Sequence, residues 1–209
     1  MDKTAITINS YNESAECFAA KFMDFAPYKN KILHFQENYA SHAKSLIDLG
    51  CGPGNVSKIF FDQNPSYEIT GFDLSEEMVN QAKQNVPNGQ FYVGDLRSID
   101  LQETYDIAIA SFCIVHLSNK ETEKFIQNIS KIINHNGYLY LSFMEGNKTQ
   151  YEATCFSEKE IYFNYFKRAV IIKLLEKAGF EIKEISEQNY KEDSGETTKD
   201  LFVFAQKAT

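Results

Sequence analysis

The sequence of 209 residues is poor in the residues that stapled or fibrous proteins need, with no tryptophan, four prolines, ten glycines and four cysteines. So little glycine and proline excludes a collagen-like or low-complexity chain. Cys17, Cys51, Cys113 and Cys155 lie more than 30 residues apart, which excludes a close-spaced zinc or redox pair. We therefore expect no metal site. Because no secretory segment is evident, we also expect reduced thiols in a cytoplasmic protein.

Positive charge and long apolar runs are also scarce. Lysine and arginine number 21 against 29 aspartates and glutamates, a net charge of −8, so the chain lacks the overall basic character of nucleic-acid-binding proteins, although a local basic patch stays open. The longest apolar runs, such as Ala169–Ile172, are far shorter than the roughly 20 residues of a membrane-spanning helix. Residues 1–10 are polar and do not resemble a signal peptide. We expect a protein that acts on neither DNA nor membranes.

Short β-type runs alternate with amphipathic helical runs, which is typical of an α/β protein with a mainly parallel sheet. Helical spacing of apolar residues predicts helices between the first six strands. The last two strands are joined by residues 190–199, too few for a helical crossover, so the final strand is predicted to be antiparallel. The length favours one domain. The seven predicted strands are Ser45–Leu49, Glu68–Asp73, Gln90–Val93, Tyr105–Ser111, Tyr138–Phe143, Glu181–Asn189 and Asp200–Gln206.

Two segments lie outside this alternation. Residues 11–39 carry Phe18, Phe22 and Phe25 at helical spacing, which predicts an N-terminal helical cap. Residues 151–166 contain six aromatic side chains. They predict either a satellite hydrophobic cluster or, because long insertions in compact domains are often functional, a lid that forms a pocket wall.

Three S-x-x-E patterns resemble the capping boxes that begin helices. They start at Ser10, Ser118 and Ser157 and place a glutamate three residues later in each case. In such a box the serine side chain and the glutamate side chain each satisfy a backbone N–H of the other residue. The patterns therefore predict helix N-termini at these three serines.

A glycine-rich loop follows the first predicted strand. Gly50, Gly52 and Gly54 alternate with other residues between this strand and a helical run, so the backbone can turn sharply and approach a ligand closely. In open α/β sheets, ligands bind beyond the carboxyl ends of the strands. A dinucleotide site needs G-x-G-x-x-G, but Asn55 stands where its third glycine belongs, and the phosphate loop with its lysine is absent.

Three acidic residues accompany this loop at the ends of strands. Asp73 closes the second strand, where a carboxylate can accept both hydroxyls of a ribose. Asp95 follows the third strand, where it can accept from an adenine amino group. Asp48, next to the glycine turn, is poorly placed for a pyrophosphate and better suited to a ligand with positive charge. For Asp73 and Asp95 the alternative is a turn or helix-cap role.

Together these stretches resemble the class I S-adenosylmethionine-dependent methyltransferases, of the small-molecule type with a methyltransferase domain of the type 11, 12 or 25 kind. The matching pieces are LIDLGCGPGNVS, ITGFDLSEEMVNQA, FYVGDL, YDIAIASFCIVHL and NGYLYLSF, in family order over about residues 44–145. The stretch AGFEIKEI and the later DLFVFAQK resemble the family's last helix and hairpin.

The resemblance implies a Rossmann-like fold with helices on both faces of the sheet. It implies a single methyltransferase domain over residues 1–209, with a cap at 1–42, a cofactor-binding core at 43–145, a lid insertion at 146–167 and a C-terminal helix and hairpin at 168–209. The cofactor would be S-adenosyl-L-methionine, with S-adenosyl-L-homocysteine as product.

The resemblance also implies a role for each cofactor-site residue. The glycine loop would line the methionyl part, with Asp48 orienting it, Asp73 would hold the ribose, and Tyr11 would cover the cofactor's carboxylate. Met78 would lie beside the adenine, with a plain core role as its alternative. The full implied set is Tyr11, Asp48, Gly50, Cys51, Gly52, Gly54, Asp73, Leu74, Met78, Asp95, Leu96, Ala110 and Ser111.

Transfer of a methyl group from a sulfonium needs mainly alignment of the acceptor. His116, just after the fourth strand, is the candidate general base because its ordinary pKa suits proton transfer; the alternative is a structural histidine. Cys113 has no identifiable activating partner for a nucleophilic role. The residues Ser111 to Ile114 lack the proline-containing motifs of enzymes that methylate DNA bases. We expect a small-molecule acceptor methylated on oxygen or nitrogen, and a monomer or homodimer.

Two other functions stay open at this point. One is a protein that binds S-adenosylmethionine without its own methyl transfer, such as a regulatory or partner-activated subunit. The other is a different nucleotide enzyme such as a dehydrogenase, against which Asn55 in the glycine loop argues.

Overall fold

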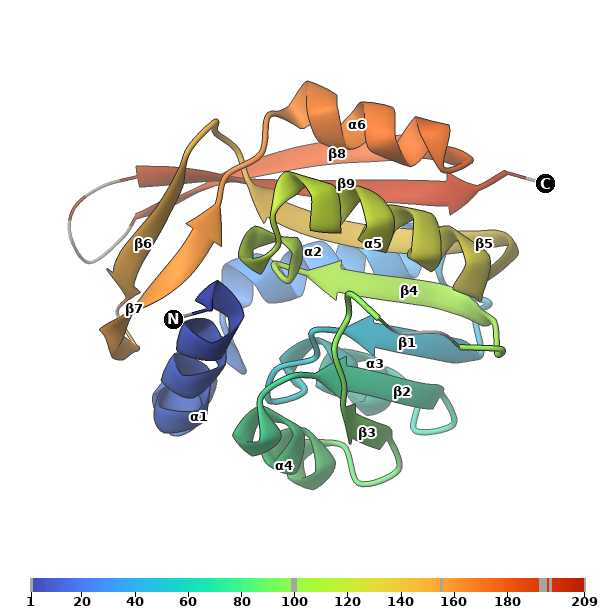
Figure 1. Ribbon diagram of the computed structural model, residues 1–209. Helices are drawn as coiled ribbons and strands as arrows, with labels where there is room; N and C mark the ends of the chain where they lie inside the picture. Colours follow the sequence, from blue (N-terminus) through green and yellow to red (C-terminus); the bar gives the residue numbers. More distant parts are fainter. Residues whose placement is uncertain (1, 99–100, 155, 192–194, 196, 209) are drawn as a thin grey trace.

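The computed structural model (Figure 1) describes residues 2–98, 101–154, 156–191, 195 and 197–208. Its main sheet has seven strands in the order β3-β2-β1-β4-β5-β9-β8. The strands are β1 (Ser45–Leu49), β2 (Glu68–Asp73), β3 (Gln90–Val93), β4 (Tyr105–Ser111), β5 (Ile133–Met144), β8 (Phe180–Lys191) and β9 (Thr197–Lys207). The first five are mutually parallel, and β9 pairs antiparallel with both β5 and β8. The predicted mixed sheet with an antiparallel final strand is confirmed.

Helices cover both faces of this sheet. Apolar residues of α2, α3 and α4 pack on one face, and those of α5 and α6 pack on the other. Central strands are apolar on both sides as a result, and Leu46 and Ile47 in β1 are fully buried. The helices are α1 (Lys3–Phe22), α2 (Ala26–Tyr39), α3 (Asn55–Gln63), α4 (Glu76–Asn85), α5 (Asn119–Ile132) and α6 (Arg168–Lys177), with a short 3₁₀ turn, η1, at Ile114–His116.

The chain reverses its direction of travel across the sheet at the centre. From β1 it moves outward through β2 and β3, and then returns to place β4 on the other side of β1. The carboxyl ends of β1 and β4 therefore flank the point where ligands bind in open α/β sheets.

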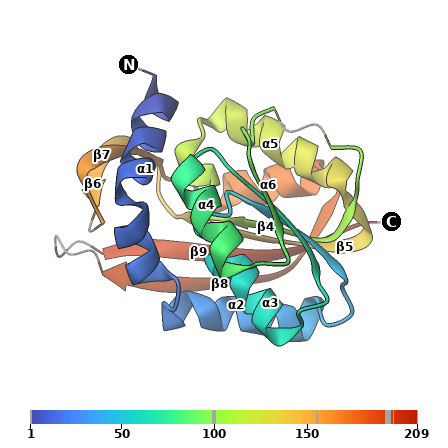
Figure 2. The ribbon, with the colours of Figure 1, turned by 90° about the horizontal axis from the view of Figure 1, so that it is seen from below.

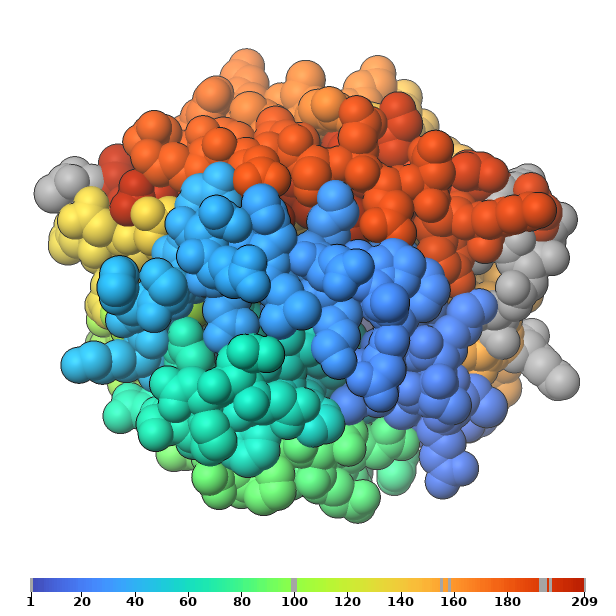
Figure 3. Space-filling model, turned by 180° about the vertical axis from the view of Figure 1, so that it is seen from behind, coloured from blue at the N-terminus to red at the C-terminus, as the bar shows by residue number. Residues whose placement is uncertain are grey.

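Helix α2 lies on the side of the molecule that faces away from the viewer in Figure 1. Figure 3 shows this side, with α2 between the C-terminal hairpin and α3. Glu184 of β8 accepts hydrogen bonds from His34 and Tyr39 of α2.

Two of the three predicted capping boxes are wrong. Ser118 does begin α5 with a complete box. Ser10 lies in the middle of α1, because that helix already begins at Lys3 with Asp2 as its cap. Ser157 begins a strand, since its segment pairs with a preceding strand. The described residues between β3 and β4 form turns and not the helix that the alternation predicted.

The aromatic insertion contains a β-hairpin that the sequence did not predict. Strands β6 (Thr149–Thr154) and β7 (Ser157–Asn164) pair antiparallel as a separate sheet. This hairpin packs beside α1, as Figures 1 and 2 show from two directions. Ser10 of α1 donates a hydrogen bond to the backbone of Glu160, and Thr7 accepts one from the backbone of Tyr162. The N-terminal helix and the insertion therefore form one layer over the carboxyl ends of the strands.

Candidate functional site

Two cavities lie beneath this layer and meet at the ends of β1 and β4. We call one the acidic cavity, because Asp73 and Asp95 line it, and the other the aromatic cavity, because rings from Phe18 to Tyr190 line it. Their volumes are similar, about 170 Å3 for the acidic cavity and about 160 Å3 for the aromatic cavity. Both are lined by Tyr11, Phe18, Gly50, Gly52, Ser111, Phe112 and His116.

The glycine loop forms the floor where the cavities meet. Gly50, Gly52 and Gly54 all have positive φ, at 77°, 52° and 82°, a conformation that other residues adopt at a cost. A Cβ on Gly50 would lie 2.5 Å from the Cβ of Cys113, so the chain passes too closely there for any side chain. Gly54 instead faces α4, where a Cβ would lie 3.2 Å from the backbone of Ala82.

Asp73 holds the loop from the end of β2. Its carboxylate accepts hydrogen bonds from the backbone N–H of Gly52 and of Ser75, each at 2.9 Å. Burial raises the pKa of Asp73 above its ordinary value, although these backbone N–H groups oppose the effect. The side chain thus joins the glycine loop to the start of α4 and still faces the acidic cavity.

Asp48 lies beneath the loop and lines neither cavity. Its Oδ2 accepts a hydrogen bond from the Ser57 hydroxyl at 2.6 Å, but its Oδ1 is buried with no hydrogen-bond partner in the described part of the chain. Burial raises the pKa of Asp48 to about 7. A buried acceptor without a donor is costly and points to a missing partner such as a ligand or water.

Asp95 is part of an ion cluster at the outer edge of the acidic cavity. Arg97 donates to both carboxylate oxygens of Asp95, and its side chain also reaches Thr4 of α1 and Glu121. These bonds from Arg97 hold the pKa of Asp95 below its usual range. Lys3 of α1 pairs with the same Glu121 at 2.7 Å. The cluster ties the first turn of α1 to the rim of the cavity.

Asn12 and Ser75 make a second tie between α1 and the acidic cavity. Ser75 caps α4 by accepting from the backbone N–H of Met78. The Ser75 hydroxyl donates to Asn12 Oδ1 at 2.6 Å. Neither the cap position of Ser75 nor its contact with a residue 63 positions earlier was predicted from the sequence.

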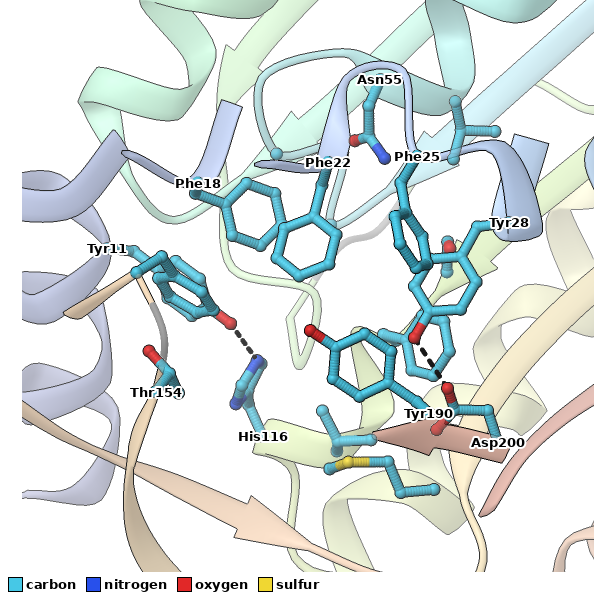
Figure 4. Close-up of a pocket in the computed structure, with 18 of the residues that line it drawn as sticks. Tyr11, Phe18, Phe22, Phe25, Tyr28, Asn55, His116, Thr154, Tyr190 and Asp200 are labelled. Carbon is cyan, nitrogen blue, oxygen red and sulfur yellow. Dashed lines mark hydrogen bonds between the residues drawn. The ribbon is translucent and has the colours of Figure 1, made fainter. Parts of the chain in front are cut away.

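His116 stands where the two cavities join, with a defined tautomer. Its Nδ1 lies 2.9 Å from the carbonyl oxygen of Tyr162, which can only accept, so Nδ1 carries the proton. Nε2 therefore accepts the hydrogen bond from the Tyr11 hydroxyl, 3.0 Å away and drawn in Figure 4. Burial lowers the pKa of His116 to about 4, so the ring is neutral at pH 7.

The aromatic cavity is walled by residues far apart in the sequence. Figure 4 shows rings of α1 and α2 along one side and Tyr190 of β8 on the other, with its hydroxyl directed toward the open centre. Asp200 of β9 accepts a hydrogen bond from the Tyr28 hydroxyl at 2.7 Å. The phenylalanines and tyrosines of its described lining are Tyr11, Phe18, Phe22, Phe25, Tyr28, Phe112, Tyr140, Phe156, Phe163 and Tyr190.

The structure gathers most of the predicted site residues at these cavities. Asp48 and Ala110 are buried beneath them, and Gly54 faces α4. Those that line one or both cavities are Tyr11, Gly50, Cys51, Gly52, Asp73, Leu74, Met78, Asp95, Leu96, Ser111 and His116. Sequence reasoning missed Thr4, Thr7, Ile8, Ser75 and Arg97 in the acidic cavity and the residues of α2, β8 and β9 in the aromatic one.

The cysteines show no sign of nucleophilic chemistry. Cys17, Cys51 and Cys113 carry free thiols, and Cys155 lies outside the described residues. Burial raises the pKa of the Cys51 and Cys113 thiols well above the ordinary value, which disfavours the reactive thiolate. Within the described ranges, no three His, Cys, Asp or Glu side chains gather as metal ligands would. No helix there has the length and apolar character that crossing a membrane requires.

The core of the chain resembles known proteins in sequence. Residues 46–137 match the family model described as "Methyltransferase domain". The chain carries a class I S-adenosylmethionine-dependent methyltransferase domain. It is 29% identical to a malonyl-[acyl-carrier protein] O-methyltransferase of Bacillus anthracis over 132 residues, which cover 59% of this chain and 48% of that one. The chain spans about half the length of such curated relatives.

Solved methyltransferase structures extend the likeness over the whole chain. Magnesium protoporphyrin IX methyltransferase of Synechocystis PCC 6803, with bound S-adenosylmethionine, superposes with a TM-score of 0.75 at 17% identity and covers 100% of this chain and 98% of its own. The 1,6-didemethyltoxoflavin-N1-methyltransferase of Burkholderia thailandensis gives 0.74 at 17% identity, covering 99% and 89%. At this identity the likeness establishes the fold.

The residues of the methyltransferase domain fit the cofactor of the family. The unsatisfied Oδ1 of Asp48 leaves an acceptor beneath the loop that could reach an amino group through water. The absence of a side chain at Gly52 leaves room above the loop, and Leu74, Met78 and Leu96 supply an apolar surface for a flat ring.

Proposed function

We propose that this methyltransferase domain binds S-adenosylmethionine in the acidic cavity and methylates an oxygen or nitrogen of a small molecule held in the aromatic cavity. The observation that carries the proposal is the junction of the two cavities at Gly50, Gly52, Ser111 and His116. A donor and an acceptor bound on either side of it would meet there, and alignment of this kind supplies much of the rate of a displacement reaction.

Each side of the junction has its own task. On the acidic side, Asp73 would hold ribose hydroxyls, Leu74 and Met78 would contact the adenine, and Tyr11 would cover the methionyl end. When bound, S-adenosylmethionine supplies an electrophilic methyl group on a positively charged sulfur. On the aromatic side, the rings exclude water from the acceptor and restrict its orientation.

His116 would orient the acceptor at the junction. Because Nδ1 donates to the Tyr162 carbonyl, the lone pair of Nε2 is the one that faces Tyr11 and the cavities. When an acceptor O–H or N–H displaces the Tyr11 hydroxyl, Nε2 can accept its hydrogen bond, and the lone pair of the acceptor atom then points away from the ring. A pKa of about 4 makes the ring a weak base. His116 is therefore better suited to hold the acceptor by a hydrogen bond than to take its proton.

Calorimetric titration with S-adenosylmethionine and S-adenosylhomocysteine tests the cofactor site. We expect micromolar binding to the intact chain and a loss of at least about 100-fold in Asp73→Ala, because the variant removes a charged acceptor from the cavity. Asp106→Ala is the matched control, since Asp106 also holds two backbone N–H groups, those of Lys44 and Ser45, but at the opposite edge of the sheet. No binding, or equal loss in both variants, would contradict the proposal.

A transfer assay separates catalysis from binding alone. The chain is incubated with methyl-labelled S-adenosylmethionine and pooled hydroxyl- and amine-bearing metabolites, and label in the products is followed. We expect transfer to at least one pool, with no transfer in Asp73→Ala. Tight binding without transfer to any pool would favour a regulatory or partner-activated subunit over an enzyme.

A further inference from the structure

The aromatic cavity contains a buried carboxylate that the proposed transfer reaction does not use. Asp200 is 1% exposed and lines the cavity wall. Because β9 runs antiparallel to β5, Asp200 near its start pairs with Met144 at the end of β5. This register brings the carboxylate to the edge of the sheet where the glycine loop also lies. The Tyr28 hydroxyl of α2 donates a hydrogen bond to the Asp200 carboxylate.

Aromatic rings pack around Tyr28, the partner of this carboxylate, and line the same cavity. The ring centroid of Tyr28 lies 5.1 Å from that of Phe112, 4.8 Å from that of Phe25 and 6.2 Å from that of Tyr190. Phe22 and Tyr190 already attract an ammonium group, since Lys21 Nζ lies 5.9 Å and 5.8 Å from their centroids. The negative faces of aromatic rings favour cations in this way.

Basic side chains contribute little inside the cavity. Among the lining residues that the structure describes, Lys29 is the one lysine or arginine, and it pairs with Asp24 at 3.3 Å. His116 is neutral at pH 7, as its lowered pKa requires. The other carboxylate of the lining, Glu152, accepts from the Tyr165 hydroxyl and lies 4.0 Å from Lys148 on the hairpin. The described lining therefore holds two carboxyl groups, those of Asp200 and Glu152, and one lysine, which is paired with Asp24.

We propose that the aromatic cavity selects a ring-bearing small molecule with a protonated amine or similar cationic nitrogen, and that Asp200 pairs with this cation. The inference rests on the proposed function and specifies its acceptor. A cation would gain both a charge-assisted hydrogen bond to Asp200 and contact with ring faces. A carboxylate in the same position would face a like charge in a poorly hydrated space, which is unfavourable.

Three probes that share an indole ring test the selection on the unmodified chain. Tryptamine carries a cationic tail, tryptophol a neutral one and indole-3-propionate an anionic one. Each is titrated calorimetrically into the full chain, with and without S-adenosylhomocysteine. We expect tryptamine to bind at least tenfold more tightly than indole-3-propionate, with tryptophol between them. Equal or tighter binding of the anion, or no binding of any probe at millimolar concentration, overturns the proposal.

Substitution of the carboxylate locates the effect. Asp200→Asn should lose at least tenfold in tryptamine affinity and leave tryptophol affinity unchanged. Asp62→Asn, an exposed carboxylate on α3 that pairs with Lys58, should change neither. An unchanged preference for the cation in Asp200→Asn overturns the role of Asp200. If that variant does not fold, the comparison of the three probes on the unmodified chain still decides.

The same samples keep the two proposals distinguishable. S-adenosylhomocysteine affinity reports the cofactor site and should be unchanged in Asp200→Asn. A chain that binds S-adenosylhomocysteine but prefers the anionic probe would retain the proposed function and lose the cation inference. A chain that prefers tryptamine but binds no S-adenosylhomocysteine would do the reverse.

Discussion

The acidic and aromatic cavities share a wall, but the chain builds them differently. Apart from the residues of α1, the acidic cavity is formed by strand ends and the turns that follow them, between Gly50 and Leu117. The aromatic cavity combines α1, α2, the hairpin and both C-terminal strands. One is set by backbone geometry in a compact stretch of sequence, and the other by side chains that meet only after folding. We therefore expect substitutions in the glycine loop to affect folding, and substitutions around the aromatic cavity to affect mainly ligand selection.

The largest expected effect is at Gly50. Gly50→Ala puts a Cβ 2.5 Å from that of Cys113 and requires φ of +77°, so overpacking and backbone strain together should cost up to about 5 kcal/mol of unfolding free energy. Gly179→Ala is the control, because Gly179 has φ of +86° but nothing within 4 Å of the added Cβ. It should cost about 1 kcal/mol. Urea unfolding measures both, and equal losses would show that the close approach to Cys113 is unimportant.

Such local constraints explain why this half of the fold was predictable. The predicted bounds of β1, β2, β3 and β4 agree with the structure at both ends. Three of these strands end at a glycine or aspartate that marks a turn in the sequence, namely Gly50, Asp73 and Gly94. Asp73 was readable for the same reason. Asp200 was predicted as a strand residue, but not as part of a site. Its hydrogen bond with Tyr28 joins residues 172 positions apart, and the Tyr11–His116 hydrogen bond joins residues 105 positions apart. No local sequence pattern indicates such pairs.

The second prediction concerns the buried carboxylate beneath the loop. Burial moves the pKa of Asp48 from 3.8 to about 7, so the folded chain holds a proton there that the unfolded chain releases, and stability falls as pH rises from about 4 to 7. Asp48→Asn should therefore stabilise the ligand-free chain by up to about 4 kcal/mol at pH 8, with the gain vanishing near pH 4.

The same substitution should weaken cofactor binding, because the unsatisfied acceptor at Oδ1 is altered. Denaturant unfolding at pH 4, 6 and 8, together with titration of S-adenosylhomocysteine, measures both effects. A variant that is less stable than the original at pH 8 would show that Asp48 is held ionised by a partner in the folded chain. That result would weaken the contrast between the acidic cavity, which backbone geometry constrains, and the aromatic cavity, which side chains form.

The third prediction concerns His116, where the two cavities meet. The pKa of His116 falls from 6.5 to about 4 on burial, so its neutral form contributes stability above pH 6.5 that is lost as pH falls toward 4. Asp48 acts in the opposite direction over the same pH range, so the contribution of His116 is the difference in unfolding free energy between the original chain and His116→Gln. This difference should shift by about 3 kcal/mol against the original chain as pH falls from 6.5 to 4. Tyr11→Phe, which removes the partner of Nε2, should keep the pH dependence. Unfolding curves between pH 4 and 7 measure this difference, and a difference that stays constant with pH would show that His116 is not the titrating group.

The smallest expected effect is at the tie between α1 and the rim. Burial works against ionisation of Glu121, but hydrogen bonds from Lys3, Ser118 and Arg97 hold its pKa at about 2. Lys3→Ala should therefore cost about 1 kcal/mol, more than an exposed pair does, because both partners are only 22% and 25% exposed. Lys58→Ala, which breaks the more exposed pair with Asp62 within α3, should cost about 0.3 kcal/mol.

Hydrogen exchange of α1 amides shows whether the tie stabilises α1 alone. In Lys3→Ala we expect faster exchange along α1 and unchanged exchange in β1 and β2, because the pair joins α1 to the rim and not to the sheet. High salt should reduce the difference from the original chain by screening the pair. Faster exchange in β1 as well would mean that α1 also stabilises the glycine loop. In that case α1 and the parallel sheet would unfold as one cooperative unit, and α1 would not open independently of the sheet.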